Sequence, residues 1–94
     1  MLYKLTEWQD VCGKWHCGCV DDLANGSNMW YLPARILNIS PAQYISWVID
    51  NYAPDDIYAS KEKCLVFISW TDQNKMRKFK NYINKKAREI NFQI

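Results

Sequence analysis

The apolar positions in the second half of the chain recur with a helical period in two segments. Residues 41–52 place apolar side chains at i, i+3, i+4 and i+7, which predicts an α-helix with one buried stripe. Ser40 is a favourable N-cap before a proline, and Pro54 ends the segment. A second helix is predicted over 72–89, where Thr71 and Asp72 provide the start. The expected stripes are Ile45, Val48, Ile49 and Tyr52, and then Met76, Phe79, Ile83, Ala87 and Ile90.

Three segments have the composition and alternation of β-strands. In residues 14–20, the tryptophan and two cysteines fall on one face and the histidine on the other. Residues 57–60 and 64–70 are separated by a short charged turn, as in a hairpin. The continuous apolar run at the start of 64–70 predicts a strand in the middle of a sheet, covered on both faces.

Shorter signals predict three further elements. Residues 6–9 (TEWQ) fit a capping box, which predicts a short helix over 7–12 that Gly13 ends. Residues 33–37 are expected to form another short helix that opens with proline. The tail, residues 92–94, is expected to pack back as an edge strand.

These elements predict an α+β fold. A small antiparallel sheet of about three strands, built from 14–20 and the 57–70 hairpin, is expected to pack against two main helices, with a short N-terminal helix in addition. A chain of 94 residues buries too little surface for two cores, and no repeat or linker divides the sequence. We therefore expect one domain over residues 1–94.

Composition narrows the class of protein. Hydrophobic residues make up 49% of the chain and aromatic residues 15%, which is too apolar for a disordered segment. The N-terminus has no basic segment followed by a long apolar run, so neither a signal peptide nor a membrane span is expected. The interpretation is a cytoplasmic protein with its cysteines as thiols and no membrane partner.

The four Cys and His residues near the N-terminus are the candidate metal ligands. Thiolate and imidazole are the donors that zinc prefers, but all four lie within eight residues, and the histidine is expected to face away from its neighbours on a strand. Ordinary core thiols are the favoured interpretation, with Cys64 as a distant alternative ligand. The same geometry disfavours a Cys–His nucleophilic pair. The set is Cys12, His16, Cys17 and Cys19.

Other chemical motifs are weaker still. The paired carboxylates at 21–22 and 55–56 stand beside turn signals, where Asp commonly bonds to backbone. The three glycines are isolated and form no phosphate-binding loop. We therefore expect no cofactor and no enzymatic activity.

Charge is distributed unevenly. The net charge is only +2, yet residues 71–94 hold seven Lys and Arg against two acids, a local charge of +5. A basic helix face can contact phosphates, although such a face is often simply solvated. The face predicted for nucleic-acid binding carries Arg77, Lys78, Lys85 and Arg88.

Aromatic residues off the predicted stripe of the 41–52 helix indicate a protein partner. Trp47 and Tyr44 are expected on its outer side, and Trp30 is expected to extend the same patch. Exposed aromatics beside polar residues are enriched in interface hot spots. The alternative is a helix that the domain covers on two sides.

The sequence also resembles small uncharacterised proteins of Firmicutes phages and mobile elements. The resemblance is carried by 30–37 (WYLPARIL), 41–45 (PAQYI) and 82–88 (YINKKAR), and covers the last two-thirds of the chain. It implies an accessory factor or inhibitor that binds a host protein or nucleic acid. The leading expectation is therefore non-catalytic binding to a host or phage protein, and the alternative is a nucleic-acid-binding module. The oligomeric state stays open.

Overall fold

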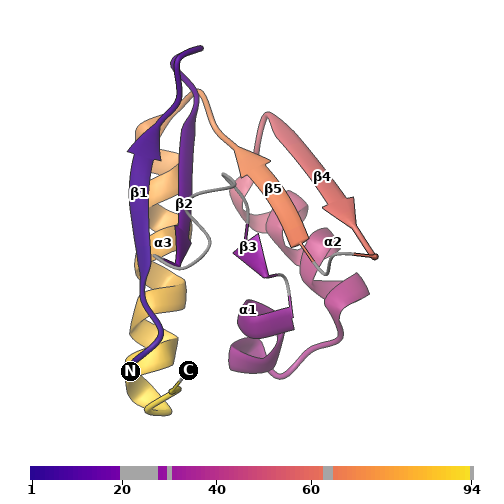
Figure 1. The fold of residues 1–94 in the computed structure, drawn as a ribbon, viewed down its shortest axis with the longest axis vertical. Coiled ribbons are helices and arrows are strands. Elements are labelled where there is room, and N and C mark those ends of the chain that lie inside the picture. Colours follow the sequence, from indigo (N-terminus) through magenta and orange to yellow (C-terminus); the bar gives the residue numbers. More distant parts are fainter. Residues whose placement is uncertain (20–27, 30, 63–64, 94) are drawn as a thin grey trace.

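The computed structural model describes residues 1–19, 28–29, 31–62 and 65–93, and these confirm the α+β class (Figure 1). The described strands form two antiparallel sheets, one with the order β1-β2 and one with the order β3-β5-β4. Along the chain the elements are β1 (Leu5–Gln9), β2 (Trp15–Cys19), β3 (Asn28–Met29), α1 (Tyr31–Leu37), α2 (Pro41–Tyr52), β4 (Asp56–Ser60), β5 (Leu65–Ser69) and α3 (Gln73–Glu89).

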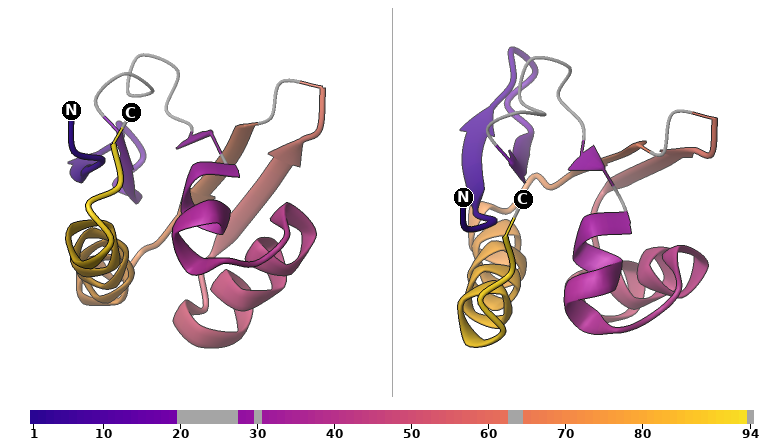
Figure 2. Two further views of the ribbon diagram at one scale, coloured as in Figure 1. Left: turned by 90° about the horizontal axis from the view of Figure 1, so that it is seen from below. Right: turned by 60° about the horizontal axis from the view of Figure 1, so that its bottom comes forward.

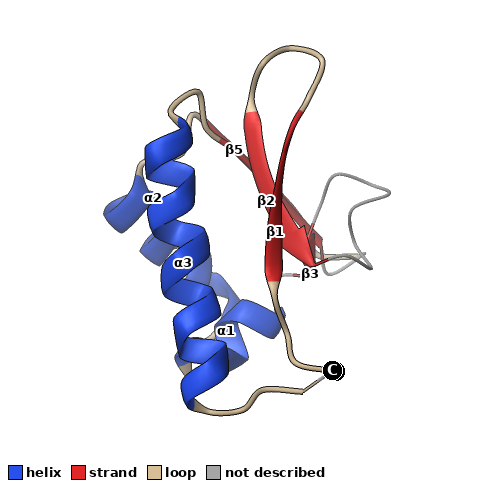
Figure 3. Cartoon of the chain, turned by 90° about the vertical axis from the view of Figure 1, so that its left-hand side faces the viewer, coloured by secondary structure: helices blue, strands red, loops and turns tan. Residues whose placement is uncertain are grey.

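The strands lie in one layer and the helices pack on one side of it (Figure 3). Helix α3 lies beneath β1 and β2, while α1 and α2 lie beneath β4 and β5 (Figures 1 and 2). The two sheets meet where Trp15 and Trp70 exchange backbone hydrogen bonds of 2.7 and 2.9 Å. Both sheets therefore turn one face toward the helices and the other away from them.

The predicted helix over 7–12 is wrong, because the N-terminal segment forms strand β1. Leu5–Gln9 pairs in register with Trp15–Cys19, and the Thr6 hydroxyl donates to the Gly18 carbonyl at 3.3 Å instead of capping a helix. Gly13, with φ of 83°, lies in the turn between the strands. A capping box is a local signal, and the strand pairing supplies more backbone partners than one helical turn would.

The predicted membership of the sheet is also wrong. Strand β2 pairs with β1 and not with the β4–β5 hairpin, and its backbone meets the segment after β5 at the bridge between Trp15 and Trp70. The hairpin itself is confirmed, with β5 in the middle of its sheet between β3 and β4. The alternation in 14–20 predicted a strand correctly, but alternation carries no information about which strand is its neighbour.

Helix α2 has the predicted bounds but turns a different side inward. Ser40 and Gln43 form a capping box, with hydrogen bonds of 2.9 and 3.1 Å. Val48 is buried as predicted, whereas Ile49 is 46% exposed. Tyr44 is buried in its place, because α2 packs against both α1 and α3. Because two helices cover α2, its buried face is rotated away from the stripe that packing against a single neighbour would bury.

Helix α3 follows Asp72, whose carboxylate accepts from the Asn74 backbone N–H at 2.8 Å. Its predicted stripe is confirmed except for Ile90, which lies beyond the helix and is 53% exposed. The tail then pairs with the N-terminus as an isolated bridge between Leu2 and Gln93. Within the described residues, no helix is long and apolar enough to span a bilayer. The confirmed stripe residues are Met76, Phe79, Ile83 and Ala87.

Candidate functional site

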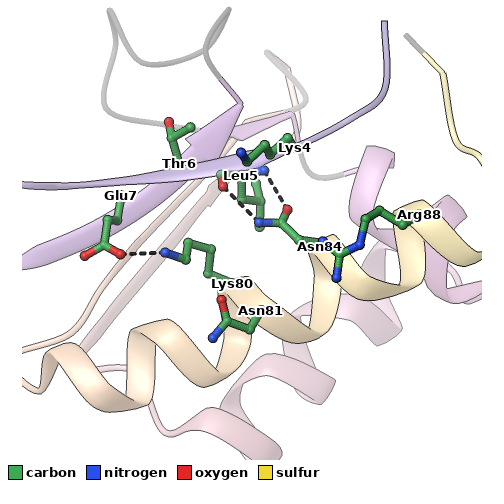
Figure 4. Close-up of a pocket in the computed structure, with 8 residues that line it drawn as sticks. All are labelled: Lys4, Leu5, Thr6, Glu7, Lys80, Asn81, Asn84 and Arg88. Atoms are coloured by element: carbon green, nitrogen blue, oxygen red, sulfur yellow. Dashed lines mark hydrogen bonds and ion pairs between the residues drawn. The ribbon is translucent and has the colours of Figure 1, made fainter.

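A polar groove runs between β1 and α3, and we call it the β1–α3 groove (Figure 4). Its volume is about 530 Å³. In Figure 4 the side chains of Leu5 and Glu7 point from β1 toward α3, while Thr6 points away, as strand alternation requires. The lining residues are Lys4, Leu5, Thr6, Glu7, Lys80, Asn81, Asn84 and Arg88.

Asn84 fixes the distance between the two walls of the groove. Its side-chain oxygen accepts from the Leu5 backbone N–H at 2.7 Å, and its Nδ2 donates to the Leu5 carbonyl at 3.0 Å. The amide thus makes the two hydrogen bonds that a neighbouring strand would make. Asn84 is only 7% exposed, so losing it would leave two buried backbone groups without partners.

Glu7 organises the cations at one end of the groove. Its carboxylate accepts from Lys80 Nζ at 2.5 Å, from Gln73 Nε2 at 3.0 Å and from Arg77 Nε at 3.2 Å. The hydrogen bond from Lys80 is the main cause that lowers the pKa of Glu7 from 4.5 to about 2, against the opposing effect of burial. Glu7 is therefore ionised at neutral pH and orients the side chains around it.

Positive charge exceeds negative charge along the lining. Lys4, Lys80 and Arg88 come from both walls, and Glu7 is the one acid among the residues that line the groove. Within the described part of the chain, neither Lys4 nor Arg88 forms an ion pair. The groove therefore presents cationic groups that an anion can contact.

The four basic residues predicted on α3 are all exposed, but they do not form one row. Arg88 lines the groove and Arg77 lies at its Glu7 end. At 100° per residue, Lys78 and Lys85 lie roughly a quarter-turn farther around the helix. The basic surface consequently begins in the groove and continues onto the outer side of α3.

The aromatic residues predicted to bind a protein partner are placed differently from expectation. Tyr44 is fully buried, so the prediction that it lies on an exposed face is wrong, and burial raises its pKa well above the usual range. Trp47 is half-buried, with its ring 5.3 Å from Tyr52 and 6.1 Å from Phe79 between centroids. The sequence pattern gave no sign that α3 covers this side of α2. Trp30 lies outside the described residues.

The candidate metal ligands are not brought together. Cys12 is exposed in the β1–β2 turn, Cys17 and Cys19 are buried on the side that faces α3, and His16 projects from the other face. Among the residues described, no three Cys, His, Asp or Glu side chains form a metal-binding group. Burial raises the pKa of Cys17, which keeps it a neutral thiol and unsuited to nucleophilic attack. Cys64 lies outside the described residues.

His16 joins the two sheets. It is 2% exposed, with Nδ1 3.0 Å from the Ile68 carbonyl oxygen and Nε2 2.6 Å from an Asp10 carboxylate oxygen. A carbonyl oxygen only accepts hydrogen bonds, so Nδ1 bears the hydrogen and donates the hydrogen bond to the Ile68 carbonyl. The hydrogen bond from His16 is the main cause that lowers the pKa of Asp10. With both nitrogens engaged, this histidine is a structural contact.

Sequence reasoning missed most of the groove. Glu7 and Lys80 are 73 residues apart, and Leu5 and Asn84 are 79 apart, so no spacing in the chain connects them. The one signal in the sequence is a polar residue beside the apolar stripe of the last helix. That residue is Asn84, which directly follows Ile83 of the stripe. Comparison of the chain with protein-family models, with curated proteins and with solved structures gave no significant match.

Replacement of Asn84 by alanine should lower the free energy of unfolding by about 2 kcal/mol or more, because the Leu5 backbone groups lose their partners. The measurement is urea denaturation followed by tryptophan fluorescence. Asn81→Ala changes an exposed residue of the same groove and should cost less than about 0.5 kcal/mol. Equal losses in the two variants would show that the Asn84 contact does not hold β1 to α3.

Stability should also depend on the ionisation of Glu7. A lowered folded-state pKa stabilises the protein above the unfolded value of 4.5, and this stabilisation is lost as pH falls toward 2. At neutral pH, Glu7→Gln should destabilise by about 1–2 kcal/mol, less than the full shift implies because solvent screens the open groove. Urea unfolding curves of the wild type and of Glu7→Gln, recorded between neutral and acid pH, measure this difference in the free energy of unfolding.

The difference between the wild type and Glu7→Gln should shrink across that acid window. Glu89→Gln removes an exposed carboxylate at the end of α3, the helix that faces Glu7, and should change stability by less than about 0.5 kcal/mol at every pH. If the wild type stayed more stable than Glu7→Gln by a constant free energy down to the lowest pH, the stabilising role of ionised Glu7 would be contradicted.

Proposed function

We propose that the protein is a non-catalytic nucleic-acid-binding module that holds the phosphate backbone along the β1–α3 groove. The observation that carries the proposal is the convergence of Lys4, Lys80 and Arg88, from opposite ends of the chain, on one polar hollow. Lysine and arginine side chains that replace condensed counterions supply most of the affinity of such contacts. Exposed Lys78 and Lys85 extend the positive surface beyond the groove.

An acidic protein surface is the other partner that a basic groove suits. The groove favours phosphates because more of its lining surface is polar than apolar, whereas protein interfaces need apolar anchors at their centre. Asn81 adds a side-chain amide of the kind that contacts phosphate and sugar.

Binding to a labelled oligonucleotide, followed by anisotropy, tests the proposal. With three or four phosphate contacts to a single strand, affinity should fall about 20- to 50-fold between about 50 and 200 mM salt. Lys4→Glu with Arg88→Glu should weaken binding at the lower salt by at least about 10-fold, because two contacts are lost and two repulsions are introduced.

The matched control is Lys61→Glu with Lys75→Glu, which changes the net charge equally at two exposed positions that do not line the groove. It should reduce affinity by less than about threefold, since distant charges are screened. Equal losses in the two double variants would attribute binding to net charge and not to the groove. An absence of binding at low salt would contradict the proposal outright.

A protein partner bound through α2 is a second candidate, in keeping with an accessory factor or inhibitor of a host or phage protein. The observation that favours it is a shallow hollow beside the half-buried Trp47, with Ile49 46% exposed on the same helix. Trp47 packs against Phe79 and Tyr82 of α3 and also lines this hollow. The hollow is lined by Ala42, Gln43, Ser46, Trp47, Asp50 and Asn51.

Ser46→Arg tests this candidate better than Trp47→Ala, because it fills the hollow without removing the contacts between Trp47 and Phe79. Affinity capture from a bacterial extract should recover a partner with the wild type and with Asn74→Arg, an exposed change on α3, but not with Ser46→Arg. Recovery of the same partner by all three proteins would remove the α2 surface from consideration.

A further inference from the structure

The face of the strand layer that points away from the helices carries a row of aromatic side chains. On β1 and β2, Trp8 and His16 are directly opposite one another, and on β4 and β5 the same is true of Tyr58 and Phe67. Alternation places all four on the side opposite the buried Cys17 and Val66. No helix of the described chain covers that side (Figure 3).

Contacts across the sheet junction connect this row. The rings of Trp8 and His16 are stacked, with centroids 5.2 Å apart and an interplanar angle of 16°. The His16 ring meets Phe67 edge to face at 4.7 Å. Tyr58 is 70% exposed at the far end. The row therefore crosses from the first sheet to the second at the contact between His16 and Phe67.

Trp8 stacks on a ring that is itself firmly held. Its partner His16 is 2% exposed and is held at both nitrogens, by Ile68 and by Asp10. Asp10 is itself fixed, because its other oxygen accepts from the backbone N–H groups of Cys12 and Lys14 at 2.9 and 3.0 Å. The half-buried indole thus rests on an immobilised platform and loses little freedom when another ring stacks on it.

Trp8 also adjoins the β1–α3 groove. By alternation, Thr6 and Trp8 of β1 share a face with Lys4, the residue before the strand. Lys4 and Thr6 line the groove as well. Residues two apart on a strand are separated by about 6.8 Å. A chain whose phosphates lie against Lys4, Lys80 and Arg88 can accordingly turn its bases over the edge of β1 onto Trp8.

We propose that the protein binds single-stranded nucleic acid, with phosphates in the β1–α3 groove and at least one unpaired base stacked on Trp8. The inference rests on the proposed function and names the form of nucleic acid. A positively charged track beside a partly exposed aromatic ring suits a single strand, because every base offers a π-face once it is unstacked. A duplex keeps its bases stacked inside and cannot use Trp8.

The test compares ligands that share a backbone. Fluorescein-labelled oligothymidylate of about 20 nucleotides, an abasic oligomer of the same length and a duplex of that length are titrated with wild-type protein at physiological salt. Oligothymidylate should bind about 5- to 150-fold more tightly than the abasic oligomer. This comparison uses the unmodified protein and does not depend on any variant folding.

Substitutions of Trp8 test whether this residue causes the tighter binding of oligothymidylate. Trp8→Leu keeps apolar cover over His16 and should lower affinity for oligothymidylate by the same factor while leaving abasic binding unchanged. Trp8→Phe should retain most of the affinity, since it preserves a π-face. Tyr82→Leu, at a 38% exposed aromatic residue on α3, should have no effect.

The outcomes separate the two proposals. If the abasic oligomer binds as tightly as oligothymidylate, or if Trp8→Leu and Tyr82→Leu behave alike, base stacking on Trp8 is overturned while phosphate binding in the groove stands. If none of the three ligands binds, the proposed function fails, and this inference fails with it.

Discussion

Both outer edges of the β1–β2 hairpin carry backbone groups that need hydrogen-bond partners, and the fold supplies these partners from distant segments. On the β1 edge, the Asn84 amide satisfies the N–H and carbonyl of Leu5. On the β2 edge, Trp15 exchanges backbone hydrogen bonds with Trp70, and His16 donates to the Ile68 carbonyl. Because an unpaired buried backbone group is costly, these contacts fix the hairpin relative to α3 on one side and to β5 on the other.

This constraint produces the two surfaces to which we assign a function. A side-chain amide, and not another strand, closes the β1 edge, so a hollow remains between the strand and α3 in which Glu7 and Lys80 meet. On the opposite face, the histidine that holds the sheets together also supports Trp8. The polar track and the aromatic surface therefore lie on either side of one strand. In the proposed account, the contacts that stabilise the hairpin also position the groups that bind phosphate and base.

The elements that the sequence predicted correctly are those with local signals. Helix α2 has a Ser-Pro start and Pro54 just beyond its end, and α3 follows an Asp N-cap, so both could be located from the chain alone. Strand β1 could not, because its residues fit a capping box and its strand pairing depends on β2. Tyr44 was misplaced for a related reason: the number of helices that cover α2 is a tertiary property. The basic side of α3 followed from helical periodicity, whereas the groove depends on pairs more than 70 residues apart.

The central claim is that phosphates lie between β1 and α3, and the most direct measurement is a map of backbone amide chemical shifts during titration with a single-stranded oligonucleotide. The account predicts that the largest changes fall on Lys4, Thr6 and Glu7 of β1 and its approach and on Lys80, Asn81 and Arg88 of α3. Changes confined to α2, around Ser46 and Trp47, or an unperturbed spectrum at low salt, would contradict it.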